Sequence, residues 1–255
     1  MTDTSTSTTS RGRVRVEPSA KRVRAVLGGQ VVVDTLHPRL VWEIRYYPAY
    51  YLPREDVRAR LEPSGRTEHS PSRGDATYYD VHAGDAVARD GAWAYPDSPM
   101  EELRDLVRFE WQALDEWLEE DELVYVHPRS PYSRVDILAS SRRVQVMVDG
   151  VELADSSRPH ILFETGLPPR YYVPLSDVRT ELLTPSDRVT QCPYKGTANY
   201  WSVQVGDRRY DDFVWMYRSP LAESAKVAGL VCFYNEKVDL IIDGVAQERP
   251  RTPFS

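Results

Sequence analysis

The sequence has few cysteines and no long apolar segment, and both shortages limit what the protein can be. Its 255 residues include only two cysteines, Cys192 and Cys232. Because a structural zinc cluster needs about four closely spaced ligands, we expect no metal and no disulfide scaffold, with a single Cys192 to Cys232 bridge as the weaker alternative. No segment approaches the roughly 20 apolar residues of a membrane-spanning helix. The first residues, MTDTSTSTTSRGR, lack the apolar core of a signal peptide, so we predict a cytoplasmic protein without membrane contact.

The chain also lacks an excess of basic residues. Its formal net charge is -7, whereas a nucleic-acid partner requires a basic surface that neutralises phosphates. Basic residues do cluster between Arg11 and Arg24, beside a Ser/Thr-rich tail. We predict that residues 1–19 form a disordered, solvated lead-in and that nucleic acid is not a partner.

The sequence contains an internal repeat. The stretch RVRAVLGGQVVVDTLHPRLVWE from Arg22 aligns without a gap with RVQVMVDGVELADSSRPHILFE from Arg143. The match continues through PAYYLPREDVR and PRYYVPLSDVR and then, after a one-residue shift, through SPSRGDATYYDV and CPYKGTANYWSV. Two copies are too few for a solenoid and predict two homologous domains. The predicted parts are a tail (1–19), a diverged first domain (20–124), a packed linker (125–141), a second domain (142–247) and a final tail (248–255).

Each copy carries the signals of strands and turns. VQVMVDGVELAD alternates apolar and polar residues around Asp149-Gly150, which predicts a hairpin, and Gly28-Gly29 occupies the same place in the first copy. Other segments, such as RYYVPL and ANYWSVQV, are rich in aromatic and β-branched residues. The fold class we predict is mainly β: two tandem homologous compact β domains, sandwich or barrel-like, each with one or two short helices.

Two segments bear on those helices. Asp56 and Asp177 open the segments DVRARL and DVRTELL, where an acidic cap before an amphipathic turn predicts one short helix in each copy. From Met100, helix propensity alone favours one long helix, but the second copy has a short helix followed by strands at this place. Homologous copies should share a fold, so we predict a turn of helix at Met100–Leu106 and strands after it.

Several stretches of the second copy, ADSSRP, FETGLPPRYYVP, CPYKGTANYW and GLVCFYNEKVD, resemble the proteins grouped as the domain of unknown function 427 family. The resemblance covers nearly all of the chain after Arg22 and implies a compact, mainly β fold. The family has carried a nucleotidyltransferase-like label. This sequence has no GxxxxGK[ST] or GxGxxG motif and no paired aspartates on a strand, so it does not support that label, and we expect no cofactor.

Glu43 and Glu164 occupy the same position of the two copies, inside the apolar segments VWEI and LFET. A buried carboxylate needs a partner. Arg58 and Arg179, which both copies keep in DVR, are the expected partners, and this structural role stands beside a role in a site.

The turn CPYKG differs between the copies, because Ser70 replaces Cys192 and Arg73 replaces Lys195, whereas the proline and glycine are kept. These two predict a fixed turn that presents its neighbours. Lys195 would favour the thiolate form of Cys192, and Glu164 is a candidate proton carrier. The first copy could keep a degenerate site at Glu43, Ser70 and Arg73.

Two functions from different classes remain open. In the first, the second domain is an enzyme for a small anionic metabolite, in which Cys192, Lys195 and Glu164 are catalytic and Arg170 holds the substrate through its planar fork. In the second, the domain is a non-catalytic module that binds a small molecule, and the candidate lining residues, besides Arg170, are Tyr171, Tyr194, Tyr200, Trp201 and Trp215. A free cysteine is also a common apolar filler, which fits Cys232 best, and a purely structural protein is a third reading.

Overall fold

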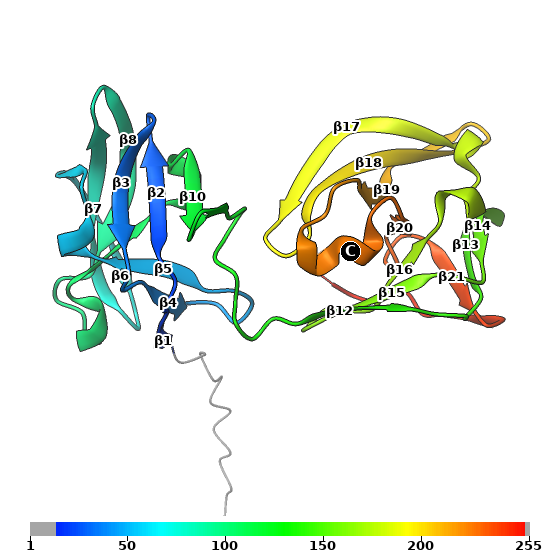
Figure 1. The fold of residues 1–255 in the computed structure, drawn as a ribbon, viewed down its shortest axis with the longest axis horizontal. Coiled ribbons are helices and arrows are strands. Elements are labelled where there is room, and N and C mark those ends of the chain that lie inside the picture. Colours follow the sequence, from blue (N-terminus) through cyan, green and yellow to red (C-terminus); the bar gives the residue numbers. More distant parts are fainter. Residues whose placement is uncertain (1–13, 253–255) are drawn as a thin grey trace, which may run out of the picture. The chain divides into compact units, whose positions relative to one another are not determined.

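A computed structural model describes residues 14–252 of the chain (Figure 1). The chain divides between Ser130 and Pro131 into two compact units. Each unit contains one seven-stranded and one four-stranded sheet, which confirms the two tandem, mainly β domains. Among the described residues, no helix is long and apolar enough to cross a membrane.

The first unit pairs all its strands antiparallel. Its seven-stranded sheet comprises, in spatial order, β1 (Arg15–Pro18), β4 (Arg39–Trp42), β5 (Ala49–Pro53), β9 (Leu106–Phe109), β8 (Ala86–Ala94), β7 (Gly74–Ala83) and β6 (Arg60–Ser70). Its four-stranded sheet comprises β11 (Glu122–Leu123), β10 (Glu116–Glu119), β2 (Val23–Leu27) and β3 (Gln30–Thr35).

The second unit repeats this plan. Its seven-stranded sheet comprises β12 (Val135–Ala139), β15 (His160–Glu164), β16 (Arg170–Val173), β20 (Val231–Phe233), β19 (Arg208–Tyr217), β18 (Gly196–Val205) and β17 (Leu183–Cys192). Its four-stranded sheet comprises β14 (Val151–Ser156), β13 (Val144–Val148), β21 (Asp239–Ile242) and β22 (Val245–Ala246). Because β12 and β17 lie at opposite edges of the larger sheet, this sheet stays open and does not close into a barrel.

The two faces of the larger sheet of the second unit carry different apolar clusters. Val214 and Met216 pack with residues of β13 and β21 in the core between the sheets. Trp215 and Tyr217, which alternate with them along β19, pack on the opposite face with Tyr172 and Cys232. This split follows from the two-residue period of a strand. The opposite face is covered by the short helix η6 (Ala222–Val227), beneath the arch of β17 and β18 in Figure 1.

The helical elements are short 3-10 turns, three in the described part of each unit. They are η1 (Arg54–Asp56), η2 (Glu101–Leu103) and η3 (Trp111–Ala113) in the first unit, and η4 (Leu175–Asp177), η5 (Thr180–Leu182) and η6 in the second. The helical turn after Met100, followed by β9 and β10, confirms the prediction from the repeat. The prediction that Asp56 and Asp177 begin helices was wrong, because η1 and η4 end at these residues.

Both predicted hairpins are present. Asp149 and Gly150 have φ values of 49° and 76°, and Gly28 and Gly29 have values of 58° and 73°. Two successive residues at positive φ are what a type I′ turn requires, and its twist matches that of the flanking strands.

Two boundaries differ from the predicted ones. Strand β1 begins at Arg15, inside the range predicted as a tail, and β12 lies inside the range predicted as a linker. Both strands pair at the edge of a seven-stranded sheet, with β4 and β15 respectively. The part of the predicted first tail at residues 1–13, and residues 253–255 of the final tail, lie outside the described residues.

Asp177, the last residue of η4, bonds Ser156 and Arg158 of the preceding segment. These bonds make the stability of the fold depend on pH in a way that can be tested. Hydrogen bonds and charge from Arg158, together with the hydroxyls of Ser156 and Ser176, lower the pKa of Asp177 to about 2, against the opposing effect of burial. A carboxylate with a lowered pKa stabilises the fold above its unfolded value of 3.8, and this contribution is lost as the pH falls through the folded value.

We therefore expect Asp177→Asn to lower the free energy of unfolding at neutral pH. The difference from the wild type should shrink as the pH falls through about 2, below which both side chains are uncharged. Urea denaturation across this pH range measures the difference. A cost that stays constant with pH would contradict a role for the carboxylate charge.

Candidate functional site

The CPYKG turn is a tight hairpin loop between β17 and β18. Cys192 pairs with Gly196 across the loop, and Gly196 has a φ of 88°, a conformation that favours glycine. The first unit repeats this geometry, with Ser70 opposite Gly74 at the same φ. These values confirm the predicted fixed turn.

Residues near η6 hold the loop of the second unit from outside. The backbone N–H of Leu221 donates to the carbonyl of Lys195 at 3.2 Å, and the hydroxyl of Ser224 donates to the carbonyl of Tyr194 at 3.1 Å. Tyr194 and Lys195 are buried. The loop is thus packed into the unit, and its lysine points away from bulk water.

Lys195 forms an ion pair with Glu164, the last residue of β15. The Nζ to Oε2 distance is 2.5 Å, and the side chains are only 11% and 12% exposed. The partners expected from the sequence were wrong: Arg179 pairs with Glu181, and the corresponding Arg58 pairs with Asp34. The cation beside Glu164 therefore comes from the CPYKG hairpin and not from the DVR segment.

Cys192 lies three residues before Lys195, on the same hairpin. Burial lowers the pKa of Lys195, but the charges of Cys192 and Glu164 and the hydrogen bond to Glu164 outweigh it, so the pKa is raised. The same cluster includes Tyr217, whose pKa is raised by burial first and then by the charges of Cys192 and Glu164, among others. Lys195 therefore stays an ammonium and Tyr217 a neutral phenol. The structure brings Lys195 to Glu164 and carries Cys192 on the same hairpin, and Tyr217, which the sequence did not indicate, interacts electrostatically with Cys192 and Glu164.

Arg170 is engaged elsewhere. Its guanidinium makes two hydrogen bonds of 2.7 Å to the carboxylate of Glu236, and the two side chains are 8% and 0% exposed. Burial opposes the charge of Arg170, but the hydrogen bond and charge of Glu236 contribute to a net raised pKa. The Arg170 guanidinium, which we expected to bind a substrate, thus binds the Glu236 carboxylate instead.

The predicted lining residues lie on different faces of the sheet. Tyr200 and Trp215 belong to the cluster on the face that carries Thr190 and Ala198, the strand neighbours of Cys192 and Gly196. Tyr171 and Trp201 pack against the core between the two sheets. Tyr171 lines a separate pocket of 130 Å³, together with residues such as Pro168, Asn235 and Pro250. The fold does not bring all the predicted aromatics to one cavity.

The two cysteines have different surroundings. Cys192 is half-buried and Cys232 is buried, and both are free thiols. Burial is the main cause that raises the pKa of Cys232 to about 12. The assignment of Cys232 to the core is confirmed, since it is buried in the cluster that contains Tyr172 and Trp215.

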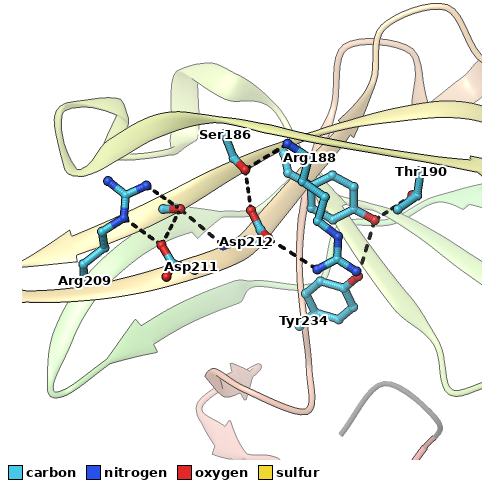
Figure 2. A network of polar contacts seen from close by, with 9 residues as sticks. Ser186, Arg188, Thr190, Arg209, Asp211, Asp212 and Tyr234 are labelled. Atoms are coloured by element: carbon cyan, nitrogen blue, oxygen red, sulfur yellow. Dashed lines mark hydrogen bonds and ion pairs between the residues drawn. The ribbon is translucent and has the colours of Figure 1, made fainter.

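A polar network supports the strands that carry the site (Figure 2). Tyr200 bonds Thr190 of β17 at 2.8 Å and Tyr234 at 3.4 Å, and the Arg188 guanidinium lies 4.8 Å from the centre of its ring. Ser186 donates to Asp212 at 2.5 Å across the bulges of β17 and β18. Thr190 and Tyr200 thus fix the strand end at Cys192, a role that no sequence motif indicated.

The corresponding residues of the first unit form a different cluster. Glu43 accepts a hydrogen bond of 2.5 Å from Tyr51 and lies 2.6 Å from Arg108 and 3.5 Å from Arg73. Trp93 is paired with Arg108, as Trp215 is paired with Cys232, so Arg108 occupies the strand position of Cys232. The first unit therefore has arginines and a serine where the second has a lysine and two thiols.

The comparisons with known proteins agree with the repeat. A family model described as Domain of unknown function (DUF427) matches residues 15–120 and again residues 136–244. No curated protein matches the chain. Within residues 14–252, no three His, Cys, Asp or Glu side chains gather in an arrangement that could hold a metal ion.

The buried pair of Arg170 and Glu236 can be tested by a double-mutant cycle. Removal of one partner leaves a buried charge uncompensated, so Arg170→Met or Glu236→Leu alone should cost about 3–5 kcal/mol in the free energy of unfolding. The double variant leaves no charge and should be more stable than either single variant. Chemical denaturation, read from the transition of the second unit, measures all four proteins. Additive costs would contradict the pairing.

Proposed function

The chain belongs to the DUF427 family, whose description names no activity, and we propose that its second unit is an enzyme with Cys192 as the nucleophile. The observation that carries the proposal is the position of the buried Lys195 ammonium, which lies 2.5 Å from the Glu164 carboxylate and belongs to the same hairpin that carries Cys192. A neighbouring cation favours the thiolate, which is the reactive form of cysteine.

The first unit supports a specialised second unit. Its hairpin has Ser70 at the position of Cys192, and its Glu43 is held by Tyr51 and two arginines. An arginine side chain stays charged and does not pass protons, whereas a lysine can. Only the second unit therefore combines a thiol with a lysine and a carboxylate.

In the mechanism we propose, Lys195 transfers protons between the other two groups. As the Cys192 sulfur attacks, its proton passes to Nζ of Lys195, and a proton of Nζ passes to Oε2 of Glu164. The ammonium charge is unchanged, and a thiol and a carboxylate become a thiolate and a carboxylic acid. The thiolate forms a bond to the electrophilic carbon as the bond from that carbon to the leaving group breaks. Lys195 gives a proton to the leaving group and takes one back from Glu164, so Glu164 serves as base and then as acid, and water then cleaves the sulfur–carbon bond and restores the thiol.

The substrate we propose is a small electrophilic metabolite with an anionic group. Lys195 is the cation beside the sulfur, and an incoming anion would share it with Glu164. Arg170 has no part in this recognition because Glu236 holds its fork. A free nucleophilic thiol suits a reducing compartment, and we place the activity in the cytoplasm.

Labelling of Cys192 with iodoacetamide tests the proposal. The protein carries Cys232→Ala so that one thiol reports, and intact mass gives the rate across a range of pH. Near neutral pH we expect labelling at least about ten times faster than that of an unstructured cysteine peptide, because Lys195 and Glu164 take up the thiol proton as the sulfur attacks.

Two lysine variants provide the matched comparison. Lys195→Met should slow labelling about ten-fold. Lys226→Met, a lysine of η6 whose ammonium donates to the carbonyl of Ile137, should leave the rate unchanged. A wild-type rate no higher than that of the peptide, or equal rates in the two variants, would make Cys192 a packing or wall residue and favour the non-catalytic binding module.

A further inference from the structure

The first unit places two guanidinium groups around one carboxylate. Arg73 comes from the loop between β6 and β7, Arg108 from β9, and Glu43 follows β4. All three side chains are largely shielded from water, with exposed fractions of 16%, 27% and 16%. Tyr51 is neutral, because burial and the neighbouring Glu43 carboxylate raise its pKa. The cluster therefore carries one positive charge in excess.

Glu43 satisfies Arg108 better than it satisfies Arg73. Its Oε1 accepts from Tyr51, and its Oε2 lies 2.6 Å from Arg108 but 3.5 Å from Arg73. The Nε of Arg73 is buried without a hydrogen-bond partner. A shielded polar group without a partner is costly, and the cost is larger when the group is charged. The site thus lacks one acceptor with a negative charge.

We propose that Arg73 and Arg108 bind a small oxyanion, either a carboxylate or a phosphate, in the first unit. The planar fork of a guanidinium matches two oxygens of such groups. Ser70, at the strand position of Cys192, lies on the same hairpin, where its hydroxyl is 3.4 Å from that of Ser72. The inference does not depend on chemistry at Cys192, because it rests on the charge balance and the unpaired donor of the first unit.

Glu43 competes with the ligand in this proposal, which gives a prediction of defined sign. Glu43→Gln removes the internal anion and raises the excess charge of the cluster from one to two. Affinity for the oxyanion should therefore rise by at least about five-fold, which is the effect of one charge at contact distance in bulk water and the lower limit for a shielded site. If the cluster served only to hold the fold, the same variant would lose stability without gaining affinity.

The experiment titrates the full chain with inorganic phosphate and, separately, with malonate, at constant ionic strength balanced with chloride. The indole N–H signal of Trp93 reports binding in 1H–15N spectra, because the Arg108 guanidinium lies 4.6 Å from the centre of its ring. Trp93→Phe assigns this signal. We expect a saturable shift with at least one anion, and the anion with the higher affinity identifies the ligand as a carboxylate or a phosphate.

Matched arginine variants locate the binding. Arg73→Gln should abolish the saturable shift, whereas Arg66→Gln, at an arginine of β6 that pairs with Glu68 and Asp90, should leave it intact. If Arg73→Gln does not fold, Glu43→Gln tests the proposal, because it should raise the affinity for the anion. Shifts that stay linear with both anions, or an affinity that Glu43→Gln does not raise, would overturn the proposal.

Discussion

A carboxylate at the end of a shielded strand must have a cation beside it, and this constraint governs the candidate site in both units. Glu164 and Glu43 occupy equivalent positions, and each is less than one-fifth exposed. An unpaired charge there would cost several kcal/mol. The β17–β18 and β6–β7 hairpins supply the cation, and a glycine at positive φ fixes the shape of each hairpin.

The two units meet this constraint with different residues, and the difference determines their chemistry. Each places a guanidinium near the equivalent tryptophan: Arg108 lies 4.6 Å from Trp93, and Arg170 lies 5.6 Å from Trp215. The arginine of the first unit reaches the strand glutamate, whereas Arg170 is bound by Glu236. Glu164 is therefore left to Lys195, which lies on the same hairpin as the Cys192 thiol.

The repeat made much of the fold predictable. It outweighed helix propensity after Met100, because a second copy of the same segment contained strands, and it identified both hairpins through their paired turn residues. The separation of Tyr200 from Trp201 was also present in the sequence, since neighbours on a strand point to opposite faces. A prediction that groups these residues by type alone misses this alternation.

The pairings of the site were harder to predict. Glu164 ends β15 and Lys195 follows β17, and these strands are not neighbours in the seven-stranded sheet. Proximity in sequence favoured Arg179, which pairs with Glu181 instead. Glu236 had no signal at all, because Arg170 has an alanine as its counterpart in the first copy and offers no comparison. Long-range ion pairs depend on register and sheet curvature, which a single sequence does not specify.

The measurement that tests the shared ammonium most directly is an NMR titration of Lys195 in the wild type, Glu164→Gln and Cys192→Ser. The pKa of Lys195 is raised in the wild type because its two acidic neighbours outweigh burial. Each variant removes one neighbour and leaves burial in place, so the account predicts a lower pKa of Lys195 in both variants. An unchanged pKa in Cys192→Ser would show that the sulfur does not share the ammonium and would contradict the account.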